Sequence, residues 1–176
     1  LCYITKRVDR TRKGKLRMED MCQLSERLTE DKYKGSYEQV ARLILKYSTS
    51  PVLDVSNFYE QVLFSFFTGN ADMHLKNFSL ITKNGKTTLT PLYDFLNSSI
   101  AIKNPEEEIA LTLKGKKSNL KATDFIDYYA KERLQLNEKT VVTILEQMEN
   151  AIPKWKELLE ISFLSDEMKE KYLELL

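Results

Sequence analysis

Three oxygen-bearing side chains, Asp72, Asn77 and Asp94, have the types needed for one reaction. Asp72 and Asn77 lie in the segment "GNADMHLKNFSLI", and Asp94 lies further along in "LTPLYDF". Phosphoryl transfer needs a carboxylate that orients or deprotonates the acceptor hydroxyl. It also needs Mg²⁺, which binds one or two protein oxygen ligands together with phosphate oxygens. These side chains therefore fit transfer of a phosphoryl group from a nucleotide.

A predicted hairpin would bring the three side chains together. The strands are "FSLIT" and "TTLT", and Asn84 with Gly85 supplies the two positive-φ residues of the turn between them. Because the strands are antiparallel, the start of the first lies beside the end of the second. We therefore expect Asp72, Asn77 and Asp94 to converge at the open end of this hairpin.

The remaining sequence predicts helices. Residues 37–48 have apolar residues at helical spacing, and "FYEQVLFSFF", with Ser56 or Asn57 as its N-cap, is apolar around most of its circumference. Further helices are expected to start at Thr123 and Asp124, at Asn137, at Pro153 and at Ser165. We expect one mainly α domain over residues 1–176, with a small β-hairpin that carries the metal-binding loop.

Composition and the ends of the chain narrow the class of protein. The 27 basic and 26 acidic residues nearly cancel, so no global field indicates a nucleic-acid or membrane binder. Cys2 and Cys22 lack metal-ligand spacing and suit reduced thiols in the cytoplasm. No membrane span or signal peptide is evident. The first residues, "LCYITKRVDR", predict a strand with Tyr3 and Ile4 as its apolar residues.

The motifs also resemble a known family. An Asp followed five residues later by Asn, and then a second Asp, is the order of the protein-kinase catalytic and metal-binding loops. "GNADMHLKNFSLI" and "LTPLYDF" resemble the signature of HipA-type serine/threonine kinases, the toxins of bacterial toxin-antitoxin modules. Further similar segments are "ITKRVDR" at 4–10, "MEDMCQL" at 18–24, "DKY" at 31–33 and "LKGKK" at 113–117.

This resemblance implies roles for individual residues. Asp72 would accept the proton of the protein substrate's hydroxyl, and Asn77 and Asp94 would bind Mg²⁺. Contacts with ATP are implied for Lys6, Arg7 and Val8 on the interlobe hinge, and for His74, Leu75, Lys76, Asn77, Tyr93 and Asp94. Val8 stands where the family usually has an aromatic residue, which removes a stacking contact but leaves the hinge. Lys76 would offset charge on the transferring phosphoryl group.

The resemblance also implies partners. The family's N-terminal lobe has a phosphate-binding loop and a lysine, whereas the five glycines here are scattered singly. We expect a C-terminal lobe that begins at the hinge strand, receives its other lobe from the same or a separate chain, and is inactive alone. Implied partners are a HipB-like helix-turn-helix antitoxin, operator DNA through that antitoxin, and a protein substrate of the aminoacyl-tRNA synthetase class.

Two alternative functions stay open. The order of Asp72, His74 and Asn77 also resembles the catalytic loop of phosphoinositide lipid kinases. A non-catalytic module that binds the antitoxin and its operator is the other alternative. Its candidate DNA or phosphate contacts are Lys114, Lys116, Lys117, Lys121, Lys131 and Arg133.

Overall fold

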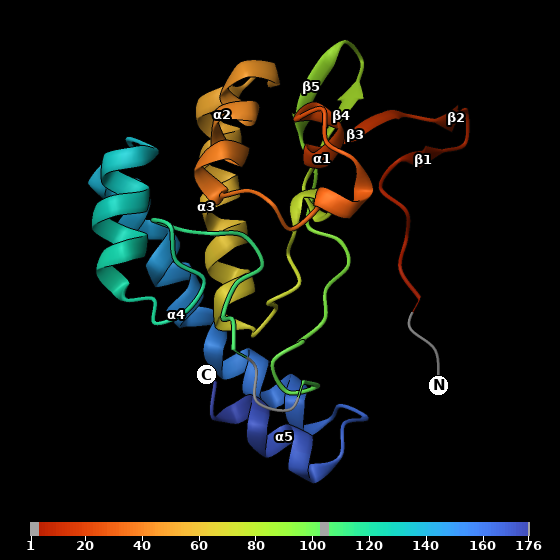
Figure 1. Cartoon of the computed structure of the whole chain (residues 1–176). Helices are drawn as coiled ribbons and strands as arrows, with labels where there is room; N and C mark the ends of the chain where they lie inside the picture. Colours follow the sequence, from red (N-terminus) through yellow and green to blue (C-terminus); the bar gives the residue numbers. More distant parts are fainter. Residues whose placement is uncertain (1–3, 103–105, 176) are drawn as a thin grey trace.

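A computed structural model describes residues 4–102 and 106–175 and consists of a helical body with small antiparallel sheets at one end (Figure 1). Cys2 and Tyr3 lie outside the described residues. The strands are β1 (Arg10–Thr11), β2 (Gly14–Lys15), β3 (Arg17–Asp20), β4 (Ser79–Lys83) and β5 (Lys86–Leu89). The α-helices are α1 (Met21–Leu24), α2 (Tyr37–Tyr47), α3 (Pro51–Phe67), α4 (Glu138–Glu160) and α5 (Asp166–Leu173). Two 3₁₀ turns, η1 (Thr29–Asp31) and η2 (Leu75–Asn77), and a π-helix, η3 (Asp124–Arg133), complete the elements.

The predicted hairpin is confirmed as β4 and β5. Asn84 and Gly85 have φ angles of 52° and 74°, in the left-handed region that this tight turn requires. A third strand, β3, was not predicted; it pairs with β4 so that Asp20 lies opposite Ser79. The mainly α fold with a small antiparallel sheet is thus as expected.

The strand predicted for the first ten residues is wrong where the structure describes it. Residues 4–9 are irregular, and the chain enters a strand only at β1, which pairs with β2 in a separate ribbon. Ile4 is 85% exposed, and no neighbouring strand in the described part of the chain supplies the hydrogen bonds that a strand at residues 4–9 would need.

Helix α3 forms the centre of the core, but it starts earlier than predicted. Its first residue is Pro51, and neither Ser56 nor Asn57 is the N-cap. Proline suits this position because its missing N–H has no partner in a first turn. Phe58 of α3 packs edge-to-face on Phe78, with ring centroids 5.0 Å apart. The predicted buried, central character of this helix is confirmed.

The C-terminal helices differ from prediction in two places. Pro153 lies inside α4 and does not start a new helix. An internal proline costs about 3 kcal/mol, but downstream packing, including Trp155 against Phe64 at 5.3 Å, favours a continuous helix. The helix predicted from Thr123 is wound as a π-helix, η3, whose wider turn places Phe125, Tyr129 and Ala130 on one buried face.

The predicted starts of α4 and α5 are confirmed. The Asn137 side chain accepts a hydrogen bond from the Thr140 N–H, and the Ser165 side chain accepts one from the Met168 N–H. None of the helices in the described ranges combines the length and apolar character needed to cross a bilayer.

The buried carboxylate of Asp54 connects α3 to the sheet through hydrogen bonds. We therefore predict that its removal destabilises the fold. Its Oδ2 accepts hydrogen bonds from the Ser48 hydroxyl and, at 3.0 Å, from the Leu89 N–H. Asp54→Ala leaves the buried Leu89 N–H without this acceptor and leaves the half-buried Ser48 hydroxyl only the Thr87 carbonyl oxygen, at 3.4 Å. It should lower the free energy of unfolding by about 3 kcal/mol. Asp127→Ala, which removes an exposed carboxylate, is the matched control. Urea unfolding that gives equal values for the two variants would contradict this role.

Candidate active site

The segment from Thr68 to Ser79 leaves α3 and consists of buried and half-buried residues. Met73, Leu75 and Phe78 are almost fully buried, with exposures of 0%, 1% and 1%. These three apolar side chains fix the backbone against the core, and Asp72 directly precedes the first of them at a half-buried position. The sequence therefore holds a polar loop in place by burying its apolar residues.

Asp72 and Asn77 are joined directly within this loop. The Asn77 Nδ2 donates to the Asp72 carbonyl oxygen at 2.9 Å, and the Asn77 N–H donates to the His74 carbonyl oxygen at 2.9 Å. Because the amide nitrogen is engaged, the Asn77 Oδ1 is the atom left to bind a cation. The Asp72 Oδ1 accepts a hydrogen bond of 2.6 Å from the Tyr33 hydroxyl.

Asp94 returns to this loop because hydrogen bonds hold the chain on both sides of it. The Tyr93 hydroxyl donates to the Lys76 carbonyl oxygen at 2.7 Å and lies 2.6 Å from the Ser79 Oγ. Burial raises the pKa of Tyr93 to about 12, so this hydroxyl remains a donor. Beyond Asp94, the Ser98 Oγ accepts from the Ala71 N–H at 2.8 Å. The structure thus brings the segment of Asp94 to the segment of Asp72 and Asn77, as the hairpin predicted.

Asp94 has an unusual backbone conformation. Its φ of 59° lies in the left-handed region, which Asp and Asn tolerate better than most residues. Its side chain is exposed, and its charge acts on His74. The half-buried Tyr93 that precedes it and the exposed Asp94 therefore differ in their surroundings.

His74 is buried beneath the site. It is 5% exposed, and its Nδ1 has no hydrogen-bond partner among the described residues. Burial, followed by the charge of Lys32, lowers the pKa of His74, so the imidazole is neutral at pH 7. Because the Nδ1 is buried as well as unpaired, the contact of His74 with ATP stays a prediction.

The side chains of Lys76 and Leu75, which were also predicted to contact ATP, are engaged within the protein. Lys76 Nζ lies 2.8 Å from the Asp20 Oδ2, so its charge is paired rather than free for a phosphoryl group. The Leu75 side chain is packed in the core and away from the surface of the site. The pairing of Asp20 with Lys76 was not predicted. The local signal in "EDMCQ" is the spacing of Asp20 and Gln23, which suits a capping box. Asp20 and Gln23 form the capping box of α1, which fixes the position of this carboxylate.

The predicted hinge residues lie on the irregular segment before β1. Lys6 and Arg7 are exposed and Val8 is half-buried. Arg7 donates two hydrogen bonds of 2.9 Å to the buried Asp9. Within residues 4–102 and 106–175, no hydrogen bond links these three residues to the loop of Asp72.

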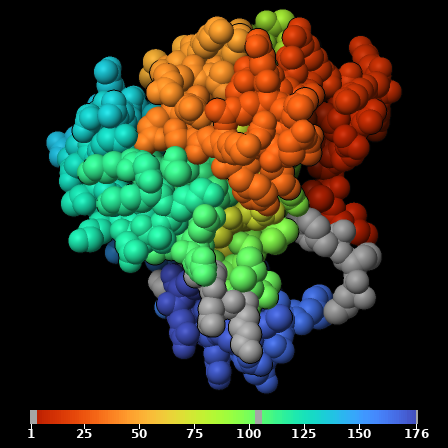
Figure 2. All heavy atoms as spheres, viewed as in Figure 1, coloured from red at the N-terminus to blue at the C-terminus, as the bar shows by residue number. Residues whose placement is uncertain are grey.

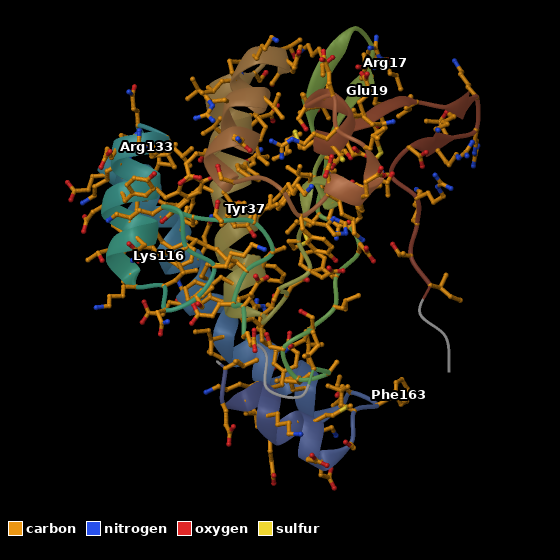
Figure 3. The ribbon with its side chains drawn as sticks, in the orientation of Figure 1. Arg17, Glu19, Tyr37, Lys116, Arg133 and Phe163 are labelled. Atoms are coloured by element: carbon orange, nitrogen blue, oxygen red, sulfur yellow. The ribbon has the colours of Figure 1, made fainter. Side chains whose placement is uncertain are left out.

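The predicted basic cluster is largely neutralised by ion pairs. Lys114 and Lys116 both pair with Asp124, at 3.5 and 3.2 Å, and Lys117 pairs with Glu107 at 3.1 Å. Lys131 and Arg133 lie near Asp127 and Glu132, each at 3.6 Å. Lys116 and Arg133 lie on the side of the molecule formed by η3 (Figure 3).

The exposed positive side chains of the β1–β2 ribbon have fewer acidic partners than those of the basic cluster near η3. Residues 10–15 of the β1–β2 ribbon project on the opposite edge from η3 (Figure 2). Arg12, Lys13 and Lys15 of this ribbon have no acidic partner in the described part of the chain.

The donor set of the loop fits Mg²⁺. Asp72, Asn77 and Asp94 offer carboxylate and amide oxygens, which are the ligands this hard cation prefers. The described residues contain no cluster of three or more His, Cys, Asp or Glu side chains able to hold a metal. The set is therefore incomplete for an all-protein cage and suits a cation that keeps waters and phosphate oxygens as its other ligands.

The sequence of this chain matches one family model and several curated proteins. The family model described as the HipA-like C-terminal domain matches residues 1–156. "Putative kinase Y4dM" of Sinorhizobium fredii is 37% identical over 155 residues, which cover 86% of this chain and 37% of that protein. "Putative kinase Y4mE" of the same organism is 27% identical over 163 residues, covering 85% and 38% of the two chains. The chain thus spans less than two-fifths of the length of these curated relatives.

Comparison with solved structures shows a shared fold. The HipA chain in a complex of Shewanella oneidensis HipA, HipB and operator DNA superposes with a TM-score of 0.76 at 20% identity. The match covers 97% of this chain and 46% of that one.

Proposed function

We propose, from the premise that this chain belongs to the HipA-like C-terminal domain family, that it forms the C-terminal lobe of an ATP- and Mg²⁺-dependent protein serine/threonine kinase. The observation that carries the proposal is the meeting of two segments. Hydrogen bonds from Tyr93 and to Ser98 hold the segment that contains Asp94 against the loop of Asp72 and Asn77. The kinase names of the curated relatives support the same reaction class.

Each residue has a defined task in this proposal. Asp72 accepts a hydrogen bond from the acceptor hydroxyl and takes its proton as the oxygen attacks the γ-phosphorus. The bond from that phosphorus to the β,γ-bridging oxygen breaks, and ADP leaves. Asn77 Oδ1 and the Asp94 carboxylate would hold Mg²⁺. The bound Mg²⁺ would neutralise charge on the phosphates of ATP. Lys76, paired with Asp20, fixes the turn η2 that carries Asn77.

The rest of the nucleotide site belongs, in this proposal, to an N-terminal lobe on the same or a separate chain. The greater length of the curated relatives leaves room for such a lobe. We further propose that the protein is a toxin and that its partner is a HipB-like antitoxin, because HipB accompanies HipA in the Shewanella complex.

The test is label transfer by the full-length protein. Incubation with γ-labelled ATP, Mg²⁺ and a cell lysate should label protein, and hydrolysis of that protein should release phosphoserine or phosphothreonine. The chain of residues 1–176 alone should give little or no label, because in this proposal the N-terminal lobe supplies the rest of the nucleotide site. Label found only in extracted lipid would favour the lipid-kinase alternative. Absence of transfer, together with salt-dependent binding of operator DNA when antitoxin is present, would favour the non-catalytic module.

A further inference from the structure

A tyrosine distant in sequence contacts the carboxylate of the proposed base. The Tyr33 hydroxyl donates to the Asp72 Oδ1 at 2.6 Å across 39 residues of sequence. In the described part of the chain, the Asp72 Oδ2 has no hydrogen-bond partner. One carboxylate oxygen of Asp72 is therefore hydrogen-bonded to Tyr33, and the other can accept a further hydrogen bond.

The backbone around Tyr33 is tied to the core on both sides. On one side, the Lys32 carbonyl oxygen accepts from the Leu75 N–H at 3.1 Å, which connects this segment to the loop of Asp72. On the other side, the Gly35 carbonyl oxygen accepts from the Thr112 N–H at 3.2 Å. Figure 2 shows the orange segment that contains these residues lying against the green segment near Thr112. The position of Tyr33 relative to Asp72 is therefore set by the fold.

The ring of Tyr33 is partly buried and partly exposed to solvent. It packs edge-on against His74, with ring centroids 5.0 Å apart, and the residue is 41% exposed. The Lys32 ammonium lies 4.9 Å from the ring centroid. The hydrogen bond to Asp72, together with burial, raises the pKa of Tyr33 to about 12. The hydroxyl therefore stays protonated, and remains a donor, throughout the neutral range.

We propose that Tyr33 is a positioning residue that fixes the Asp72 carboxylate by holding Oδ1, so that Oδ2 faces the incoming acceptor hydroxyl. This inference rests on the proposed kinase function. A catalytic base commonly needs a third group that holds its orientation, and a donor to one carboxylate oxygen is such a group. The half-exposed ring beside it forms part of the surface that the protein substrate meets.

The substitution Tyr33→Phe separates positioning from packing, since it keeps the ring against His74 and removes only the donor. The matched control is Tyr47→Phe at the end of α2. Tyr47 is 39% exposed and has the Lys46 ammonium 4.7 Å from its ring centroid, so its setting resembles that of Tyr33 without contact to the site.

The experiment uses the full-length protein, γ-labelled ATP, Mg²⁺ and, as acceptor, the protein labelled in the lysate assay. Tyr33→Phe should lower kcat about tenfold, the value expected for one charge-assisted hydrogen bond. It should leave the KM for ATP unchanged, because the substitution removes only the hydroxyl from which Asp72 accepts a hydrogen bond. Tyr47→Phe should match the wild type in both measurements.

Three results would overturn the assignment. If Asp72→Asn abolishes transfer but Tyr33→Phe keeps the wild-type kcat, the positioning role fails and the kinase proposal stands. If Tyr33→Phe lowers kcat only in step with a lowered melting temperature, and raises the KM for ATP as well, the tyrosine is merely structural. If Asp72→Asn is fully active, Asp72 is not the base, and both proposals fail together.

Discussion

Replacing Asp72 with asparagine should lower phosphoryl transfer by the full-length protein about 1,000-fold, since a positioned general base contributes about 100- to 10,000-fold. Asparagine keeps the shape of the side chain and an oxygen for the Tyr33 hydroxyl, so the loop should retain its structure. What it removes is the charge and the capacity to take a proton. Steady-state transfer of label from ATP to the acceptor protein measures the effect.

The control for this prediction is Asp127→Asn. Asp127 is an exposed carboxylate of η3, whose only ion pair among the described residues is a 3.6 Å contact with Lys131. Surface pairs of this kind contribute about 0–1 kcal/mol, so the control should keep wild-type activity. A rate for Asp72→Asn within a few-fold of this control would show that Asp72 is not the base.

Asp94→Asn should lower transfer about 100-fold at limiting Mg²⁺, which corresponds to the loss of about 3 kcal/mol from one metal contact. Asparagine is the informative choice because, like aspartate, it tolerates the left-handed backbone found at this position. Alanine would add backbone strain to the loss of the ligand. Titration with Mg²⁺ should recover part of the rate, since the amide oxygen remains a weak ligand.

The matched control here is Glu132→Gln, which removes the charge of an exposed carboxylate on η3. Its rate and its dependence on Mg²⁺ should equal those of the wild type. If Asp94→Asn lowers the rate equally at all Mg²⁺ concentrations, Asp94 acts on the shape of the loop and not as a metal ligand.

Local sequence signals predicted several elements well. Asn84 and Gly85 specified the hairpin turn because few other residue pairs adopt two consecutive positive φ angles. Asn137 and Ser165 marked helix starts, since their side chains satisfy N–H groups only three residues away. The approach of Asp94 to Asp72 followed from the antiparallel geometry of the same hairpin.

Other features could not be read from local patterns. Pro153 is a strong local signal for a helix start, yet α4 continues through it because the packing of Trp155 and Leu159 offsets the local cost. The sequence predicted two basic patches, but several of their residues are paired with carboxylates, including Asp124. Charge in a sequence does not reveal which charges the fold neutralises.

The sequence by itself determined the types and order of the candidate site residues, the hairpin beside them and the caps of α4 and α5, because these depend on neighbours a few residues apart. Only the tertiary structure decided that Tyr33 holds Asp72 and that Asp20 pairs with Lys76. Those partners are 39 and 56 residues apart. Such contacts form only where burial of Met73, Leu75 and Phe78 has already fixed the loop against the core.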